Sequence, residues 1–246
     1  MSTLLYITRR QLPSKKICLF LQSGQPHACL PQKLGFTIPP SLKSLTTSSP
    51  RIVLASTSPS RLHILRSAGI EPITVAPNVD EDAVITALPD ASPVRIVEEL
   101  AQAKAHAASP AYPNDIVIGG DSMLLLDGQL QGKPHTEEKT IERWHQQSGR
   151  TAELITGHCV VTPKGEHLEV AITSLDFAEV PEEDIRAYAA TGEPLKCAGA
   201  FTLEALGGWF VDGINGDSSS VIGLSLPVVR RALYRYGYSV SQFWNR

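Results

Sequence analysis

Residues 51–246 switch repeatedly between short apolar runs and apolar residues spaced at the period of a helix. Residues 51–55 form the first apolar run, which is rich in β-branched side chains and typical of a buried strand. Ser58 and Pro59 then supply an N-cap and a first helical residue, and Gly69 supplies a stop. The pattern predicts a strand, a hydroxyl-rich loop and a helix in that order.

The same patterns continue to the end of the chain. Asp127-Gly128, directly after the expected strand 115–126, is a hairpin turn signal. The remaining predicted helices cover 92–108, 136–149, 181–191 and 226–236, and the remaining strands cover 115–126, 152–162 and 167–177. Helices and strands alternate only in part, with hairpins between them. This order predicts an α/β fold built on a mixed sheet rather than on a doubly wound parallel one.

Composition excludes several classes of protein. The chain has 246 residues, of which 42% are hydrophobic and 19% charged, as in an ordinary globular protein. No apolar run reaches the ~18 residues of a membrane-spanning helix. The net charge of −3 excludes a strongly basic nucleic-acid binder. The four cysteines are too few and too scattered for a disulfide framework, which favours a reducing, cytoplasmic location: Cys18, Cys29, Cys159 and Cys197.

The first fifty residues differ from the rest in charge. Residues 1–50 contain six basic residues and no acidic one, whereas residues 51–246 carry 16 basic and 25 acidic residues. The first segment is also rich in proline, serine and threonine and lacks a sustained apolar period. We therefore expect a poorly ordered basic extension over 1–50 and a folded domain over 51–246. A structured arm and a targeting segment remain alternatives for the extension.

Two places in the predicted domain indicate chemistry on a phosphate-like anion: a loop that would bind it and a carboxylate that would act beside it. The loop from Ser56 to Arg61 combines hydroxyls, a helix N-terminus and a guanidinium, which suits phosphate groups. Capping serines beside a surface arginine would give the same pattern. Asp121 lies inside an apolar strand, where a carboxylate is costly unless it is paired. It would be a general base, a metal ligand, or a strand-end residue bonded to a backbone N–H.

Further charged residues each allow a functional and a purely structural interpretation. Lys104 shares the apolar face of its helix, and Lys133 lies in a Gly-Lys-Pro turn. Both would bind phosphate as point charges, or one snorkels and the other is an ordinary turn residue. The run Asp80-Glu81 would suit Mg²⁺ or Mn²⁺, or would form a solvated acidic turn. The segment 213–218 would form an anion-binding backbone nest or a polar turn.

In this order, the motifs resemble the Maf family of septum-formation-associated nucleoside triphosphate pyrophosphatases. Ser56-Thr57-Ser58-Pro59-Ser60-Arg61 and Gly119-Gly120-Asp121-Ser122 are two of the matching stretches. The others lie at 79–81, 103–105, 132–134, 148–151, 156–157, 188–195, 198–201 and 216–227. Each motif alone is weak, but their collinear order over about 51–237 is specific.

The resemblance implies an α/β fold related to inosine triphosphatases, with a cleft between two lobes, and an enzyme that is often dimeric. The implied reaction hydrolyses a nucleoside triphosphate to the monophosphate and pyrophosphate with a divalent cation, Mg²⁺ or Mn²⁺. Asp121 would activate water, with Glu81 and Lys104 as further catalytic residues, and Glu81 and Asp121 would hold the metal. The implied phosphate- and substrate-binding residues are Ser56, Ser58, Arg61, Lys104, Lys133 and Lys196.

Two departures from the family pattern bear on function. Ser60 stands where the family commonly has an arginine, so one phosphate contact is missing or comes from elsewhere, such as Lys196. Phe201 and Glu204 stand where Tyr and Gln are frequent, near the expected base site, which leaves dTTP, UTP or a modified nucleotide open as substrate. The alternative function is a nucleotide-binding regulator of cell division with weak or lost catalysis. We expect no specific nucleic-acid partner, no membrane association and a homodimer.

Overall fold

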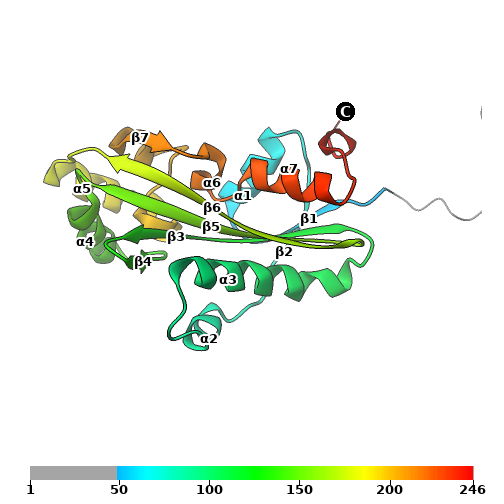
Figure 1. The fold of residues 1–246 in the computed structure, drawn as a ribbon. Helices are drawn as coiled ribbons and strands as arrows, with labels where there is room; N and C mark the ends of the chain where they lie inside the picture. The colour runs from blue at the N-terminus through cyan, green and yellow to red at the C-terminus, as the bar shows by residue number, and fades with distance from the viewer. Residues whose placement is uncertain (1–48, 246) are drawn as a thin grey trace, which may run out of the picture. The chain divides into compact units, whose positions relative to one another are not determined.

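The computed structural model describes residues 49–245, whose strands form one mixed sheet (Figure 1). The sheet order is β2-β1-β3-β5-β6-β7, and β4 pairs with the free edge of β3. The strands are β1 (Ile52–Ala55), β2 (Ile73–Val75), β3 (Ile116–Leu126), β4 (Gln129–Gln131), β5 (Thr151–Thr162), β6 (Gly165–Phe177) and β7 (Val211–Asn215). The first two strands run parallel to their neighbours and the later pairs are antiparallel. The predicted mixed-sheet α/β fold is confirmed.

Helices cover both faces of the sheet. They are α1 (Pro59–Ser67), α2 (Glu81–Thr86), α3 (Pro93–Ala108), α4 (Glu137–Gln147), α5 (Glu182–Ala190), α6 (Ser218–Ile222) and α7 (Leu226–Arg235). In Figure 1, α3 lies along one face, while α1, α6 and α7 lie on the other. The pair α4 and α5 packs at the end of the sheet opposite to the turn that joins β5 and β6. No helix in the range 49–245 is long and apolar enough to cross a membrane.

The predicted helix starts are confirmed by their caps. The side chains of Ser58, Ser92 and Thr136 each accept a hydrogen bond from the backbone N–H three residues further on. Pro59 and Pro93 occupy the first helical turn, where no intrahelical N–H is required. Because Ser58 caps α1, the first turn of that helix begins directly beside the end of β1.

Two glycines let α3 lie unusually close to the sheet. A Cβ atom on Gly119 would lie 2.4 Å from the carbonyl oxygen of Ala101, and one on Gly157 would lie 2.3 Å from that of Val97. Neither distance is possible between real atoms, so only glycine fits at these two positions. The close approach places Lys104 of α3 directly against the side chain of β3 residue Asp121.

Strand pairing along one edge of β3 is interrupted between its two partner strands, β1 and β4. Residues 116–119 pair with β1 and residues 124–126 pair with β4. On that edge, no described strand pairs with residues 120–123, although β5 pairs with them on the other side. The interruption leaves a gap in the sheet between the end of β1 and the end of β4.

The hydrophobic core has two main clusters, one toward each end of the sheet. The first contains Leu124, Trp144, Leu175, Phe177, Tyr188 and Phe201. Its Trp144 ring stands edge-on to Phe177, Tyr188 and Phe210, an arrangement that aromatic rings favour. The second cluster contains Ile52, Leu54, Leu65, Ile118, Leu224 and Leu233. These clusters form the interiors of the two expected lobes, and the gap in the sheet lies between them.

The structure also departs from the sequence-based elements. Glu81 opens a short helix, α2, capped by Asp80, so the expected acidic turn is wrong. Residues 213–215 belong to β7, and Asp217 caps α6 through its side chain, so the expected loop over 213–218 is only partly correct. β2 was not expected at all. The predicted basic extension over 1–50 lies almost wholly outside the described residues, and its boundary stays a prediction.

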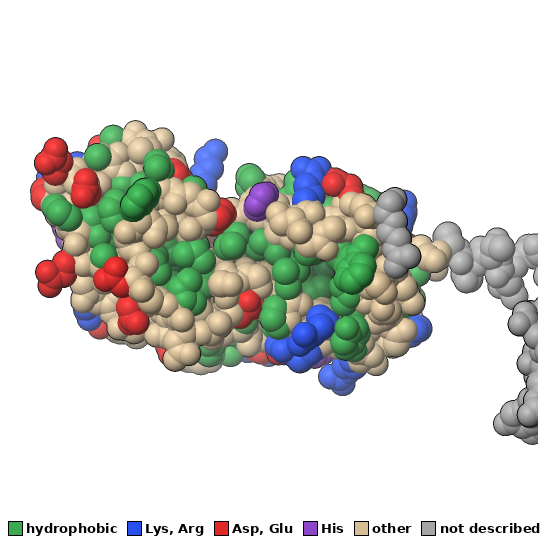
Figure 2. All heavy atoms as spheres, turned by 90° about the horizontal axis from the view of Figure 1, so that it is seen from above, with side chains coloured by type: hydrophobic (Ala, Val, Ile, Leu, Met, Phe, Trp, Pro, Cys, Tyr) green, Lys and Arg blue, Asp and Glu red, His purple; other side chains and the backbone are tan. Residues whose placement is uncertain are grey.

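Charged side chains are unevenly distributed on the face seen in Figure 2. Acidic side chains gather at the end of the body that carries α5, whose first turn contains Glu182, Glu183 and Asp184. Most of the lysines and arginines visible there lie in the half that carries α1 and α7. Part of the negative charge of the body is therefore concentrated at one end.

Candidate active site

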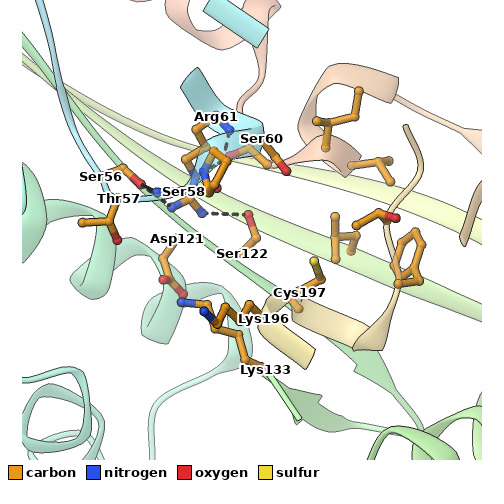
Figure 3. A pocket seen from close by; sticks show the side chains of 18 of the residues that line it. Ser56, Thr57, Ser58, Ser60, Arg61, Asp121, Ser122, Lys133, Lys196 and Cys197 are labelled. Carbon is orange, nitrogen blue, oxygen red and sulfur yellow. Dashed lines mark hydrogen bonds between the residues drawn. The ribbon is translucent and has the colours of Figure 1, made fainter. Parts of the chain in front are cut away.

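A cavity of about 370 Å³ opens at the gap in the sheet (Figure 3). It lies beside the end of β1, the first turn of α1 and the unpaired stretch of β3. All eight residues that the sequence singled out for chemistry line it: Ser56, Ser58, Arg61, Glu81, Lys104, Asp121, Lys133 and Lys196. The structure therefore brings together in one cavity residues that are up to 140 positions apart in the chain.

Arg61 is held in the wall of the cavity by neutral acceptors. Its Nε donates to the Gly223 carbonyl at 2.7 Å, its Nη1 to Ser56 Oγ at 3.3 Å, and its Nη2 to Ser122 Oγ at 3.2 Å. The guanidinium has five N–H groups, so these three bonds leave donors available for a ligand. The Arg61 side chain is buried, yet no ion pair to it forms within the part of the chain described here. Burial lowers the pKa of Arg61, and the negative charges of Asp121 and Glu81 oppose that shift.

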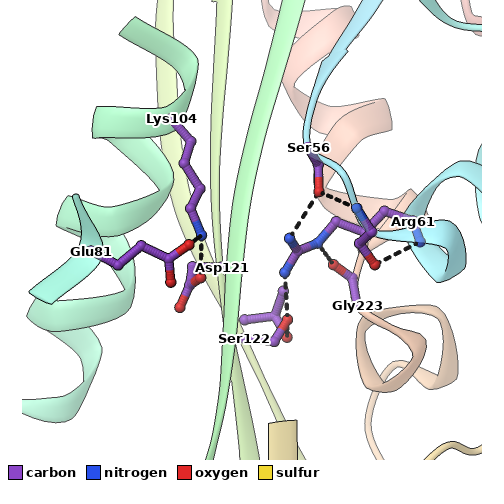
Figure 4. A network of polar contacts seen from close by, with 9 residues as sticks. Ser56, Arg61, Glu81, Lys104, Asp121, Ser122 and Gly223 are labelled. Atoms are coloured by element: carbon purple, nitrogen blue, oxygen red, sulfur yellow. Dashed lines mark hydrogen bonds and ion pairs between the residues drawn. The ribbon is translucent and has the colours of Figure 1, made fainter. Parts of the chain in front are cut away.

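A buried lysine joins two carboxylates on the opposite side of β3 (Figure 4). Lys104 Nζ lies 2.6 Å from Asp121 Oδ1 and 2.8 Å from Glu81 Oε1. The positive charge of the lysine offsets the repulsion between the two carboxylates, so both can lie close to each other. Asp121 Oδ2 is buried and has no hydrogen-bond partner in residues 49–245. A carboxylate oxygen left without a partner at a cavity wall is ready to accept a proton or a cation.

Glu81 reaches the site from the first turn of α2. Burial alone would raise the pKa of its carboxyl group, but the hydrogen bond and charge of Lys104, with further help from Lys133 and Arg61, hold that pKa below its usual range. The Glu81 side chain keeps 42% of its exposure, so it faces the cavity from the solvent side. A negatively charged, partly hydrated carboxylate at this position suits a hard divalent cation.

The donor set fits the divalent cation that the family implies. Two carboxylates meet at Lys104, and the buried Oδ2 of Asp121 lacks any other partner among the described groups. Oxygen donors of this kind are the ligands that Mg²⁺ and Mn²⁺ prefer. Glu81 and Asp121 are therefore the residues that would hold such an ion.

Two exposed lysines complete the positive lining. Lys133 follows β4, and Lys196 ends the short 3₁₀ helix Glu193–Lys196. Both side chains face the cavity in Figure 3, and neither forms an ion pair with a described carboxylate. Ser60 also lines the cavity, so the position where an arginine was expected by resemblance faces the ligand space. The two lysines therefore add positive charge to the cavity lining.

Sequence reasoning missed the residues that support the site. Ser122 accepts from Arg61 and from Thr156 Oγ1, the latter at 3.1 Å, and Gly223 supplies the carbonyl that fixes Nε of the same arginine. Glu193 accepts hydrogen bonds from the Tyr188 and Thr202 side chains and from two backbone N–H groups, which ties down the cavity wall. Ser122 directly follows Asp121 in a recognised motif, which was the available signal. The partners of Gly223 and Glu193 become visible only once the chain is folded.

Fold and site together define a mixed α/β protein with a cavity that combines a buried guanidinium, two exposed lysines and a buried carboxylate. The Maf-like protein family model matches residues 51–236, and the chain belongs to this family. The predicted family membership is thereby confirmed.

Several relatives match about four fifths of the chain. A protein of Corynebacterium diphtheriae is 69% identical over 194 residues, which are 79% of this chain and 98% of the relative. A protein of Corynebacterium efficiens is 64% identical over 196 residues, or 80% of this chain and 100% of the relative, and a protein of Nocardia farcinica is 54% identical over 203 residues, or 78% and 96%. All three are named nucleoside triphosphate pyrophosphatase. The Ham1 protein of Staphylococcus aureus matches at a TM-score of 0.35 and 19% identity, over 52% of this chain and 72% of that protein, a likeness too low to support an argument.

Proposed function

We propose that this protein hydrolyses nucleoside 5′-triphosphates to the monophosphate and pyrophosphate, as a housecleaning enzyme of the nucleotide pool. The Maf-like match and the names of the relatives support this activity. The observation that carries the proposal is that two unpartnered groups line one cavity. One is a buried guanidinium with no described counter-ion, and the other is a buried carboxylate oxygen with no described hydrogen-bond partner. A polyphosphate supplies the missing anion, and a water molecule that attacks it supplies the missing hydrogen-bond donor.

We infer a part in the reaction for each group from its position in the cavity. Arg61, Lys133 and Lys196 bind the phosphate chain and take up its negative charge, which grows on the leaving group. Asp121 accepts a proton from a water molecule, and the water oxygen attacks the α-phosphorus. The bond from that phosphorus to the bridging oxygen breaks, so the monophosphate and pyrophosphate separate. Lys104 holds the Asp121 carboxylate in place through a hydrogen bond to Oδ1, which leaves Oδ2 for the water.

Glu81 and Asp121 would hold a divalent cation, Mg²⁺ or Mn²⁺, at the cavity wall. Such an ion, when bound, neutralises phosphate charge and helps to orient the substrate. Glu81 would contribute a carboxylate oxygen to the ion while its Oε1 stays paired with Lys104. The chemistry on the protein side remains that of Asp121 and the surrounding cations.

The test is a screen of pyrophosphate release with Mg²⁺ and with Mn²⁺ over canonical and modified nucleoside triphosphates. We expect saturable release of one pyrophosphate for each monophosphate formed, with at least one strongly preferred base. Saturable nucleotide binding without pyrophosphate release across the whole panel would refute the enzyme and favour a nucleotide-binding regulator. Ser60 is the sequence feature on which that alternative rests, because it removes a cationic side chain from the cavity.

The remaining expectations extend the same proposal. We propose a cytoplasmic homodimer that has no specific nucleic-acid partner. Mass measurement in solution at enzyme concentrations used for turnover tests the dimer. A monomeric mass with full activity would refute it.

A further inference from the structure

A second cluster of metal-ligating side chains lies on the α3 face of the sheet, in a different place from the Glu81–Asp121 pair. His106 belongs to α3, Cys159 to β5 and Glu166 to β6, and one ligand atom from each lies within 4.8 Å of the other two. Figure 1 shows where these elements meet, at the end of α3 beside the turn that joins β5 and β6.

Strand register explains why the cluster forms. Glu166 pairs with Val161 across the β5–β6 ladder, and Cys159 lies two residues before Val161. Side chains alternate along a strand, so Cys159 and Glu166 share the face that α3 covers. His106 lies one helical turn after Gln102, and both side chains reach down to Glu166.

The cluster is held as a metal site usually is. One oxygen of Glu166 faces the His106 Nε2, and the other accepts a hydrogen bond from Gln102 Nε2 at 2.7 Å. An outer hydrogen bond of this kind orients a carboxylate ligand. The Cys159 side chain is fully buried, whereas His106 is exposed and is held beside the cluster by its contact with Glu166.

We propose that His106, Cys159 and Glu166 bind a zinc ion through an imidazole nitrogen, a sulfur and a carboxylate oxygen. Ligand atoms around tetrahedral zinc are separated by roughly 3.3–3.5 Å, so closure requires movements of about 1 Å in two side chains that are not fully buried. The thiol of Cys159 loses its proton to solvent as the zinc–sulfur bond forms. A water molecule or the Gln102 amide oxygen fills the fourth position.

The donor set separates this ion from the one proposed for the catalytic cavity. Thiolate and imidazole ligands favour Zn²⁺, whereas Mg²⁺ and Mn²⁺ prefer oxygen. The bound zinc would join α3 to β5 and β6. Because Lys104 lies two residues before His106 on the same helix, the ion also fixes the helix that carries the partner of Asp121.

The test uses the full-length protein after removal of metal with a chelator. Co²⁺ serves as an optical probe, since a cobalt–thiolate bond produces a charge-transfer absorption, and zinc affinity is measured by competition with a chromophoric chelator. We expect one Co²⁺ with a thiolate band for each chain, displaced by zinc but not by excess Mg²⁺, which competes only for the oxygen-donor site at Glu81 and Asp121. Zinc should also raise the temperature of unfolding, because it binds the folded state.

Matched variants locate the ion. Cys159→Ser should abolish the thiolate band, and His106→Ala should weaken zinc binding by more than about tenfold. His145→Ala is the control for the second variant, because His145 is equally exposed and pairs with Glu182 at 2.6 Å, with no cysteine in that pair. Cys197→Ser, at the other cysteine of the described part, is the control for the first.

Both controls should bind zinc like the unchanged protein. Absence of saturable zinc binding, or a thiolate band that persists in Cys159→Ser, would overturn the proposal. Because His106 is exposed, the His106→Ala variant should fold. It keeps the test decisive if the Cys159→Ser variant fails to fold. Unchanged zinc affinity in folded His106→Ala would also overturn it.

Discussion

Replacing Asp121 by Asn should separate catalysis from binding. The amide keeps the shape of the carboxylate and can still accept a hydrogen bond from Lys104, but it cannot take a proton from water. Removing a general base of this kind costs about 10²–10⁴-fold in rate. We expect kcat for pyrophosphate release to fall by that factor, while KM at saturating Mg²⁺ changes little, because Glu81 still offers a carboxylate to the ion and the phosphate chain is held by other groups.

The cost to stability follows from the contacts of Lys104. Orphaning a buried charge costs ~3–5 kcal/mol, but here Lys104 keeps Glu81 at 2.8 Å. The loss should therefore be that of one charged hydrogen bond, about 1–3 kcal/mol in the free energy of unfolding. The Asp121→Asn variant should remain folded at room temperature, which makes its kinetics interpretable.

Asp115→Asn is the matched control for this experiment. The Asp115 and Asp121 side chains are both 9% exposed, and each carboxylate lies 2.6 Å from its cationic partner, which is Arg51 for Asp115. Asp115 does not line the cavity. Steady-state release of pyrophosphate, calorimetric nucleotide binding and thermal unfolding should be measured on both variants. Turnover of Asp121→Asn within threefold of the unchanged protein, or an equal loss in Asp115→Asn, would remove Asp121 from the role of base.

Three further predictions test the supports of the site. Arg61→Lys should raise KM at least tenfold in steady-state assays, since an ammonium cannot make the three directed bonds of the guanidinium and still reach a phosphate; an unchanged KM would contradict this role. Gly119→Ala should lower the free energy of unfolding by about 1–3 kcal/mol in denaturant titrations, because the new methyl group forces α3 away from the sheet. In the control variant Gly132→Ala, the new Cβ meets nothing within 4 Å, so the free energy of unfolding should change by under ~0.5 kcal/mol. Equal losses at both glycines would count against the packing argument. Burial, reinforced by the Arg61 charge, lowers the pKa of His158 from 6.5 to about 4, so the unfolded chain binds this proton first and stability should fall by on the order of 3 kcal/mol as pH drops between those values. His158→Gln, which keeps an acceptor for the Ser225 N–H, should flatten that part of the stability–pH curve, and an unchanged slope would show that His158 does not cause it.

The sequence was most informative where local chemistry decides structure. Ser58 and Ser92 mark their helices because a hydroxyl cap and a following proline act within a few residues. Long strands such as β5 and β6 show their apolar runs plainly. Asp121 and Lys104 could be selected because burying a carboxylate or a lysine has a cost that demands an explanation. The exposed Lys133 and Lys196 carry no such signal and were found through their motifs.

Tertiary contacts decided what sequence reasoning missed. α2 has six residues and none of them is buried, so it has no apolar period to recognise, and its position depends on contact with α3. β2 has three residues and is defined by pairing with β1. The bond from Arg61 to the Gly223 carbonyl spans 162 positions, and no local pattern encodes it.

The interruption along β3 limits how this family member can change. Lengthening both β1 and β4 by two residues would let hydrogen bonding run continuously across 120–123, a change that ordinarily strengthens a sheet. Here the added backbone would fill the space that a substrate must enter. Selection for a more regular, more stable architecture and selection for turnover therefore oppose each other at these four positions, and engineered stabilisation should leave this break in the ladder untouched.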